Sequence, residues 1–124
     1  MYFAYWMVLV AAFLPYAATA YAKHGSADNH TPRLYVQTLT GPRQRADWAQ
    51  RNHFEAFPTF AAAVIIASIA GVSHAIVNWL AGIFVALRIF YTFAYITDQA
   101  TLRSILFILG SLCVLGLFVA AGLA

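Results

Sequence analysis

The sequence predicts an all-α membrane protein, built as a bundle of four transmembrane helices. Of its 124 residues, 63% are hydrophobic and only 9% are charged, whereas about 25% of the residues of a soluble domain are charged. Two stretches of 21 residues, 2–22 and 104–124, contain no charged side chain. At about 1.5 Å per residue, each is long enough to cross the roughly 30 Å hydrocarbon core of a bilayer. The sequence lacks the alternating segments of about ten residues that typify an outer-membrane barrel.

The four predicted spans follow one another closely enough to form a single integral membrane domain. The N-terminal apolar stretch has no basic start and exceeds the roughly 7–15 residues of a signal-peptide core, so we expect a retained helix. Residues 71–73 form a tight, uncharged connection between the second and third spans. The spans are expected at residues 2–22, 53–71, 74–97 and 102–123, within one domain covering residues 1–124, with a loop at residues 23–44.

Basic residues are concentrated between the first and second spans. Five of the seven Lys and Arg side chains lie within residues 23–51, whereas the connection at residues 71–73 has none. By the positive-inside rule the first loop is cytoplasmic and both termini face the opposite side. We expect a bacterial inner membrane, with both termini in the periplasm. This bias accounts for the net charge of +3, so we expect no nucleic-acid partner. The single cysteine, Cys113, is expected to be a small packing residue of the last span.

The most informative stretch is residues 45–60, RADWAQRNHFEAFPTF, where a charged segment runs into an apolar one without a turn signal. In one helix, Arg45, Asn52 and Glu55 share a face, because side chains three, four and seven positions apart lie on neighbouring turns. Arg51 lies at the edge of that face, four positions before Glu55, and we expect the two to be close enough to pair. Ionisable groups at the border of an apolar region are costly and usually functional.

The third and fourth spans add polar residues at the same cytoplasmic side. Arg88, Tyr91 and Tyr95 are spaced by three and four positions and therefore form one stripe. Arg88 lies roughly 13 Å inside the cytoplasmic end at the standard helical rise, at a depth where an Arg costs about 2.5–3.5 kcal/mol. It needs a partner, and Glu55 enters from the same side, so the sequence predicts an ion pair between Arg88 and Glu55. The fourth span opens with Arg103 at this face.

Together these spans bring a set of polar side chains to one depth of the bilayer. The candidate site residues are Arg51, Asn52, Glu55, Arg88, Tyr91, Tyr95, Arg103 and Ser104. Arginines clamp carboxylates and Glu55 can accept an ammonium, so the set suits a small, net-anionic ligand that carries its own amine. Glutathione has this pattern, and its thiol needs a nearby cation or hydroxyl to become the reactive thiolate. No metal site is predicted.

The order and spacing of these residues resemble the MAPEG family, the membrane-associated proteins of eicosanoid and glutathione metabolism. The matching positions of the second span are Arg45, Ala46, Ala49, Asn52, Glu55, Pro58 and Phe60, preceded by Pro32 and Arg33. The later matching positions are Arg88, Tyr91 and Tyr95 on the third span and Arg103 and Ser104 on the fourth. The resemblance covers nearly the whole chain and agrees with the four-span prediction.

The resemblance implies a homotrimer of four-helix subunits that binds glutathione between neighbouring subunits near the cytoplasmic face. The residues it assigns to the ligand are Arg51, Asn52 and Glu55 for the peptide and Tyr91 and Tyr95 for the pocket walls, with Arg88 as a structural partner. Arg103 is expected to stabilise the thiolate with help from Ser104. The implied function is that of a glutathione-dependent membrane transferase or peroxidase acting on lipophilic electrophiles.

Two other functions stay open at the level of the sequence. The same polar cluster can serve helix packing and oligomerisation in a non-catalytic membrane protein, with Arg88 and Glu55 as an interhelical contact, since polar pairs are used in this way in membranes. The basic cytoplasmic face can instead bind an anionic lipid head group. The expected partners are therefore glutathione, a lipophilic small molecule, membrane lipid and further copies of the chain.

Overall fold

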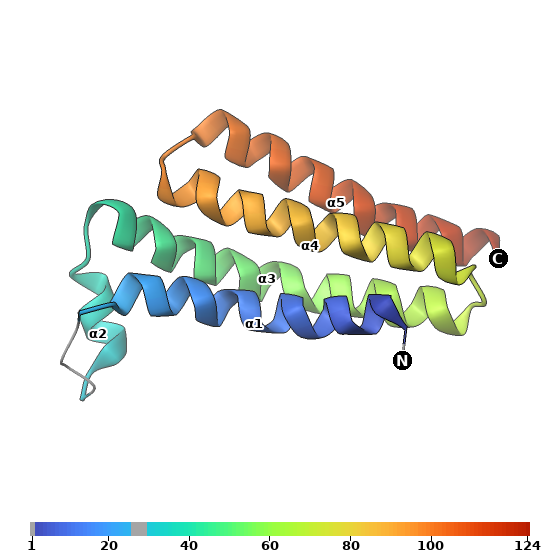
Figure 1. Cartoon of the computed structure of the whole chain (residues 1–124), viewed down its shortest axis with the longest axis horizontal. Helices are drawn as coiled ribbons and strands as arrows, with labels where there is room; N and C mark the ends of the chain where they lie inside the picture. The colour runs from blue at the N-terminus through green and yellow to red at the C-terminus, as the bar shows by residue number, and fades with distance from the viewer. Residues whose placement is uncertain (1, 26–29) are drawn as a thin grey trace.

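Four long helices and one short helix make up the computed structural model, which describes residues 2–25 and 30–124 (Figure 1). The long helices are α1 (Phe3–Lys23), α3 (Gly41–Ile69), α4 (His74–Ile96) and α5 (Ala100–Leu123), and the short one is α2 (Pro32–Gln37). Each long helix is apolar and long enough to cross a membrane, and the described residues contain no strand. The predicted fold class, an all-α bundle of four membrane-spanning helices, is confirmed.

The segment between α1 and α3 is more structured than the loop expected from the sequence, although residues 26–29 of that loop lie outside the described part. Residues 32–37 form α2, which begins with a proline. Proline is favoured at the first helical position because its fixed φ suits the helix and its missing N–H has no partner there. A small apolar cluster holds α2 against the end of α1 and the start of α3: Ala22, Val36, Leu39 and Ala46.

The four long helices run alternately up and down the bundle (Figure 1). α3 and α4 lie at its centre: α1 packs against both of them on one side, and α5 packs against both on the other. Both termini lie at one end, the termini end, whereas α2 and the α4–α5 turn lie at the other, the α2 end (Figure 1). At about 1.5 Å per residue the 29 residues of α3 span about 43 Å, more than the roughly 30 Å hydrocarbon core. The first, charged turns of α3 therefore extend beyond the apolar layer.

Close packing of aromatic and small side chains holds the termini half of the bundle together. The rings of Phe60 on α3 and Phe84 on α4 are stacked, with centroids 4.0 Å apart and planes 12° apart. Gly110 on α5 faces Phe84, and a Cβ at that position would meet the ring at 3.7 Å, so α5 approaches α4 closely here. Cys113 lies buried in the same core, in the packing position expected for it.

A side-chain bond to a backbone carbonyl and a tight turn shape the α2 half of the bundle. Arg45 Nε donates a 2.9 Å hydrogen bond to the carbonyl oxygen of Ile96, one of the last carbonyls of α4, which have no partner within their own helix. The chain then turns through Asp98, whose φ of 60° lies in the left-handed region that Asp tolerates better than most residues. Because α5 begins directly afterwards, at Ala100, Arg103 lies in its first turn, beside the end of α4.

Candidate functional site

A polar cavity of about 370 Å³ lies at the α2 half, between α3, α4 and α5. Its lining residues are Asn52 from α3, Tyr91 and Tyr95 from α4, and Arg103, Ser104, Phe107 and Ile108 from α5. The structure thus brings together most of the candidate residues, which are separated in the chain by up to 52 positions between Asn52 and Ser104. We call this space the Arg103 cavity.

A second space of about 460 Å³, here called the apolar groove, adjoins it. Asn52 and Phe107 line both spaces, so the two are neighbours. Glu55 and Arg88 supply the polar part of the groove, and the rest of its wall is largely apolar: Ala56, Thr59, Phe84, Gly110, Ser111, Val114, Leu115 and Phe118. The polar Arg103 cavity beside the apolar groove suits two ligands, one polar and one lipophilic.

Two tyrosine rings hold the two cations of the site. The guanidinium carbon of Arg103 lies 4.5 Å from the ring centroid of Tyr95, and that of Arg88 lies 4.1 Å from the centroid of Tyr91. The two rings meet edge to face, with centroids 5.7 Å apart. A cation is attracted to the negative face of an aromatic ring but keeps its N–H donors. Within residues 2–25 and 30–124, the Arg103 side chain has no hydrogen-bond acceptor or ion-pair partner, so the guanidinium donors are available to a ligand.

The predicted ion pair between Arg88 and Glu55 is wrong. Arg88 Nη2 donates instead to Asn52 Oδ1 at 2.7 Å, and Nη2 and Nε donate to His53 Nδ1 at 2.9 and 3.2 Å. His53 lies on the face of α3 that packs against α4 and is 3% exposed, whereas Glu55 projects from an exposed face. At 100° per residue the two positions lie on opposite sides of α3: His53 faces into the contact with α4, whereas Glu55 lies next to Asn52 at the border of the apolar groove and forms no ion pair with Arg88.

His53 and its partner Thr92 are site residues that the sequence prediction missed. His53 Nε2 lies 2.7 Å from Thr92 Oγ1, and Thr92 Oγ1 donates to the carbonyl oxygen of Arg88 at 2.9 Å. A signal was present in the sequence: His53 continues the stripe of buried positions at Ala46 and Ala49 with spacings of three and four. A polar ring on a buried stripe needs hydrogen-bond partners, and here they come from α4.

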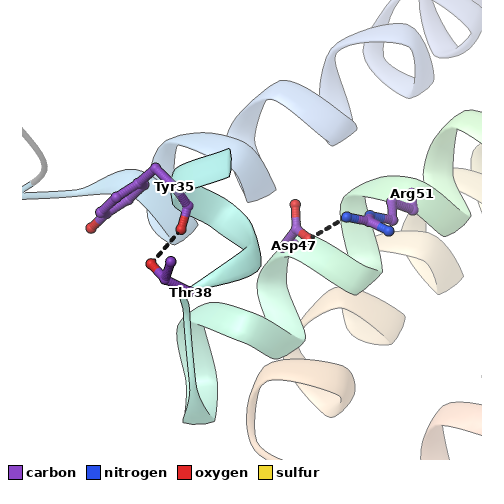
Figure 2. A network of polar contacts seen from close by, with 4 residues as sticks. All are labelled: Tyr35, Thr38, Asp47 and Arg51. Carbon is purple, nitrogen blue, oxygen red and sulfur yellow. Dashed lines mark hydrogen bonds and ion pairs between the residues drawn. The ribbon is translucent and has the colours of Figure 1, made fainter. Parts of the chain in front are cut away.

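Arg51 is the candidate residue that the structure places away from the two spaces. The expected contact with Glu55 is not formed, and Arg51 Nη2 lies 3.3 Å from Asp47 Oδ2, so its side chain turns back along α3 toward α2 (Figure 2). Asp47 is 4% exposed, and a buried carboxylate needs a cation or donor more than an exposed one does. The same view shows α2 beside this turn, where Thr38 Oγ1 donates to the carbonyl oxygen of Tyr35 at 2.6 Å (Figure 2).

The candidate residues therefore fall into three groups. The Arg103 cavity contains Asn52, Tyr91, Tyr95, Arg103 and Ser104. The apolar groove adds Glu55 and Arg88. Arg51 lines neither space. In the described part of the chain, no group of three or more His, Cys, Asp or Glu side chains could hold a metal ion.

These features define a multi-pass integral membrane protein whose helices line an open, cation-bearing polar cavity beside an apolar groove. The model of the MAPEG family matches residues 3–123, nearly the whole chain. The chain belongs to the MAPEG family, and the resemblance seen in its motifs is confirmed. This family membership places it broadly among the membrane proteins of glutathione and eicosanoid metabolism. A search of the curated proteins and a search of the solved structures each gave no match.

Proposed function

We propose that the protein is a glutathione-dependent transferase or peroxidase that acts on lipophilic electrophiles. The observation that carries the proposal is the Arg103 cavity, where a cation without a protein acceptor faces the same space as an amide, two phenols and a hydroxyl in a MAPEG chain. Its volume of about 370 Å³ falls within the range of small-molecule sites.

Arg103 is proposed to stabilise the glutathione thiolate, with the Ser104 hydroxyl as a second donor. The thiolate is the nucleophilic form of a thiol, and a nearby cation increases its population at neutral pH. The face of Tyr95 orients the guanidinium without consuming its N–H groups. Because these donors are already in position, no reorganisation is required when negative charge develops on sulfur.

The remaining polar residues are proposed to bind the peptide. Asn52 lines both spaces, and Glu55 in the groove can accept hydrogen bonds from the ligand's ammonium. Tyr91 and Tyr95 are proposed as walls of the pocket. Arg51 can clamp a carboxylate only after exchanging its contact with Asp47 for one with the ligand, so its share of the binding is expected to be smaller than the family resemblance implies.

The electrophile is proposed to enter along the apolar groove from the bilayer. In conjugation, the thiol proton passes to water, sulfur bonds to the electrophilic carbon, and the leaving group departs with the electron pair of the broken bond.

In peroxide reduction, sulfur attacks one peroxide oxygen and the O–O bond breaks. The alcohol then takes a proton, and a second glutathione converts the sulfenic acid to disulfide and water. Both reactions use the same thiolate, so the site supports either.

The assembly is proposed to be a homotrimer with glutathione held between neighbouring subunits. Glu55 lines the groove yet is exposed in the single chain, which supports a site that a second copy completes. The α2 end is proposed to face the cytoplasm because it carries most of the basic side chains. Both termini then face the periplasm if the host membrane is a bacterial inner membrane.

An Arg103→Ala variant tests this function. We expect kcat/KM for conjugation of glutathione to a chlorinated nitroaromatic to fall about 100-fold, the usual effect of removing one donor to a developing anion. Arg33→Ala is the matched control, because Arg33 is exposed on α2 and lines neither space. Isothermal titration of glutathione into the purified protein measures the dissociation constant. Equal activity of the two variants removes Arg103 from its role, and an inactive, non-binding wild type rejects the function.

The packing alternative has one observation in its favour: the Arg88 side chain links α4 to α3 through its hydrogen bonds to Asn52 and His53. On that hypothesis Glu55→Gln weakens the oligomer, and millimolar glutathione does not change the melting temperature. Our proposal expects glutathione to raise it, because a ligand that binds only the folded state stabilises that state. Native mass spectrometry distinguishes a retained tripeptide from a retained anionic phospholipid, the third alternative.

A further inference from the structure

The partners of Arg88 settle which atoms of Asn52 and His53 accept hydrogen bonds. A guanidinium can only donate. The Asn52 atom 2.7 Å from Arg88 Nη2 must therefore be the amide oxygen, and His53 Nδ1, which faces Nε and Nη2, must be the unprotonated ring nitrogen. The amide orientation and the histidine tautomer thus follow from chemistry rather than from a choice between similar atoms.

The other ring nitrogen of His53 completes the chain of hydrogen bonds. Thr92 Oγ1 gives its own proton to the carbonyl oxygen of Arg88 at 2.9 Å, so it is free to accept from His53. Nε2 of His53, 2.7 Å away, carries the ring's single proton and donates it. His53 is therefore neutral, and the order of donation runs from Arg88 to His53, from His53 to Thr92 and back to the Arg88 backbone. Each bond restricts the next, so the guanidinium has one orientation.

The same orientation determines what Asn52 offers to a ligand. Because Arg88 occupies the amide oxygen, the NH2 group of Asn52 points away from Arg88. Among residues 2–25 and 30–124 this NH2 group has no hydrogen-bond partner, and no buried side-chain polar atom of that part is left unsatisfied, so the group is open to the adjoining space. Asn52 borders both the Arg103 cavity and the apolar groove. It therefore presents donors at the junction of the two.

We propose that His53 is a positioning residue that acts through Arg88 to hold Asn52 as a hydrogen-bond donor, making this corner of the site selective for a carboxylate or peptide carbonyl of the ligand. The inference rests on the proposed function, since glutathione supplies those acceptors. A neutral imidazole also suits this task better than a carboxylate, because it holds Arg88 without cancelling its charge. The corner keeps a positive charge that favours an anionic ligand.

Two matched pairs of variants test the proposal. His53→Gln keeps an acceptor for Arg88 and a donor for Thr92, whereas His53→Leu removes both. Thr92→Ser keeps the hydroxyl, whereas Thr92→Val removes it at nearly constant volume. In the full chain in nanodiscs, we expect KM and Kd for glutathione to rise about tenfold in His53→Leu and less in Thr92→Val, the effect of losing one charge-assisted contact. His53→Gln and Thr92→Ser are expected to bind nearly as wild type, and kcat at saturating glutathione is expected to change less than KM in all four.

Three results overturn the inference. The first is wild-type affinity in His53→Leu, and the second is a His53→Gln variant as weak as His53→Leu. The third is read from ¹⁵N-histidine NMR of the ligand-free protein, with His53→Gln used for assignment: a ring that is charged, or protonated on Nδ1, contradicts the hydrogen-bond order. The NMR measurement needs no ligand, so it tests the arrangement even if wild type fails to bind glutathione and the proposed function is rejected.

Discussion

The two halves of the bundle are held together by different means, although the same long helices build both. In the termini half, stacked Phe60 and Phe84 pack beside Gly110. In the α2 half, Arg88 links α4 to Asn52 and His53 of α3 through hydrogen bonds. Lipid tails are as apolar as the side chains they surround, so apolar packing in a membrane has little hydrophobic driving force. It stabilises the bundle mainly through van der Waals contacts. Hydrogen bonds are directional, so they restrict each side chain to a single orientation, which packing alone does not do.

This difference indicates why the polar part of the candidate site lies in the α2 half, whereas Phe84 and Gly110 of the termini half line only the apolar groove. A ligand of defined charge pattern requires donors and acceptors at fixed angles, and aromatic packing alone does not provide them. The cost of placing Arg88 within the bilayer, about 2.5–3.5 kcal/mol on an insertion scale, is offset there by hydrogen bonds and by the face of Tyr91. Three changes separate the two kinds of support.

The largest effect is expected from Arg88→Met. It removes the donors to Asn52 and His53, which costs about 1–3 kcal/mol for each unsatisfied group, but it also removes a charge that costs about 2.5–3.5 kcal/mol in the bilayer. These terms nearly cancel, so the melting temperature is expected to change little. Glutathione affinity is expected to fall about 100-fold, because Asn52 loses its orientation and the corner loses its charge. Titration calorimetry measures the affinity, and thermal unfolding measures the melting temperature. A large loss of stability with unchanged affinity would show that Arg88 supports the fold and not the ligand site, which contradicts the prediction.

Phe60→Ala is expected to have the opposite profile. Phe60 is fully buried, and the corresponding change costs roughly 3–5 kcal/mol in a soluble core. In a membrane the transfer part of that cost is largely absent, so we expect about 2 kcal/mol, from the cavity left beside Phe84. Denaturation in mixed detergent micelles measures the free energy of unfolding, and Phe60→Leu serves as the milder control. A change in glutathione affinity larger than about twofold would show that the halves are energetically coupled.

The smallest effect is expected from Asp47→Asn. The contact with Arg51 is between residues four positions apart on one helix and has a well-exposed arginine, an arrangement worth at most about 0.5 kcal/mol. Stability should therefore be almost unchanged. Arg51 becomes free to turn toward a ligand, and we expect glutathione affinity to rise up to about twofold, which matches the small free energy of the contact that no longer competes. Titration at low and high salt measures it, and Arg51→Ala, in which the freed cation is absent, should show no gain.

Much of the architecture could be predicted from the sequence because the bilayer imposes it. Uncharged stretches of 21 residues can only be helices in lipid, where every backbone group must be paired within its own segment. The spacing of Arg88, Tyr91 and Tyr95 placed them on one face for the same geometric reason. Family motifs at the right distances then led to MAPEG, which the family comparison confirmed.

Which side chain pairs with which was decided by the tertiary structure. Charge alone favoured Glu55 as the partner of Arg88 and of Arg51, yet Arg88 contacts Asn52 and His53, and Arg51 contacts Asp47. The rotation of α3 about its own axis determines which positions face α4, and that rotation follows from the packing of the whole bundle. Helical periodicity defines faces within one helix, but only the assembled helices determine which faces meet.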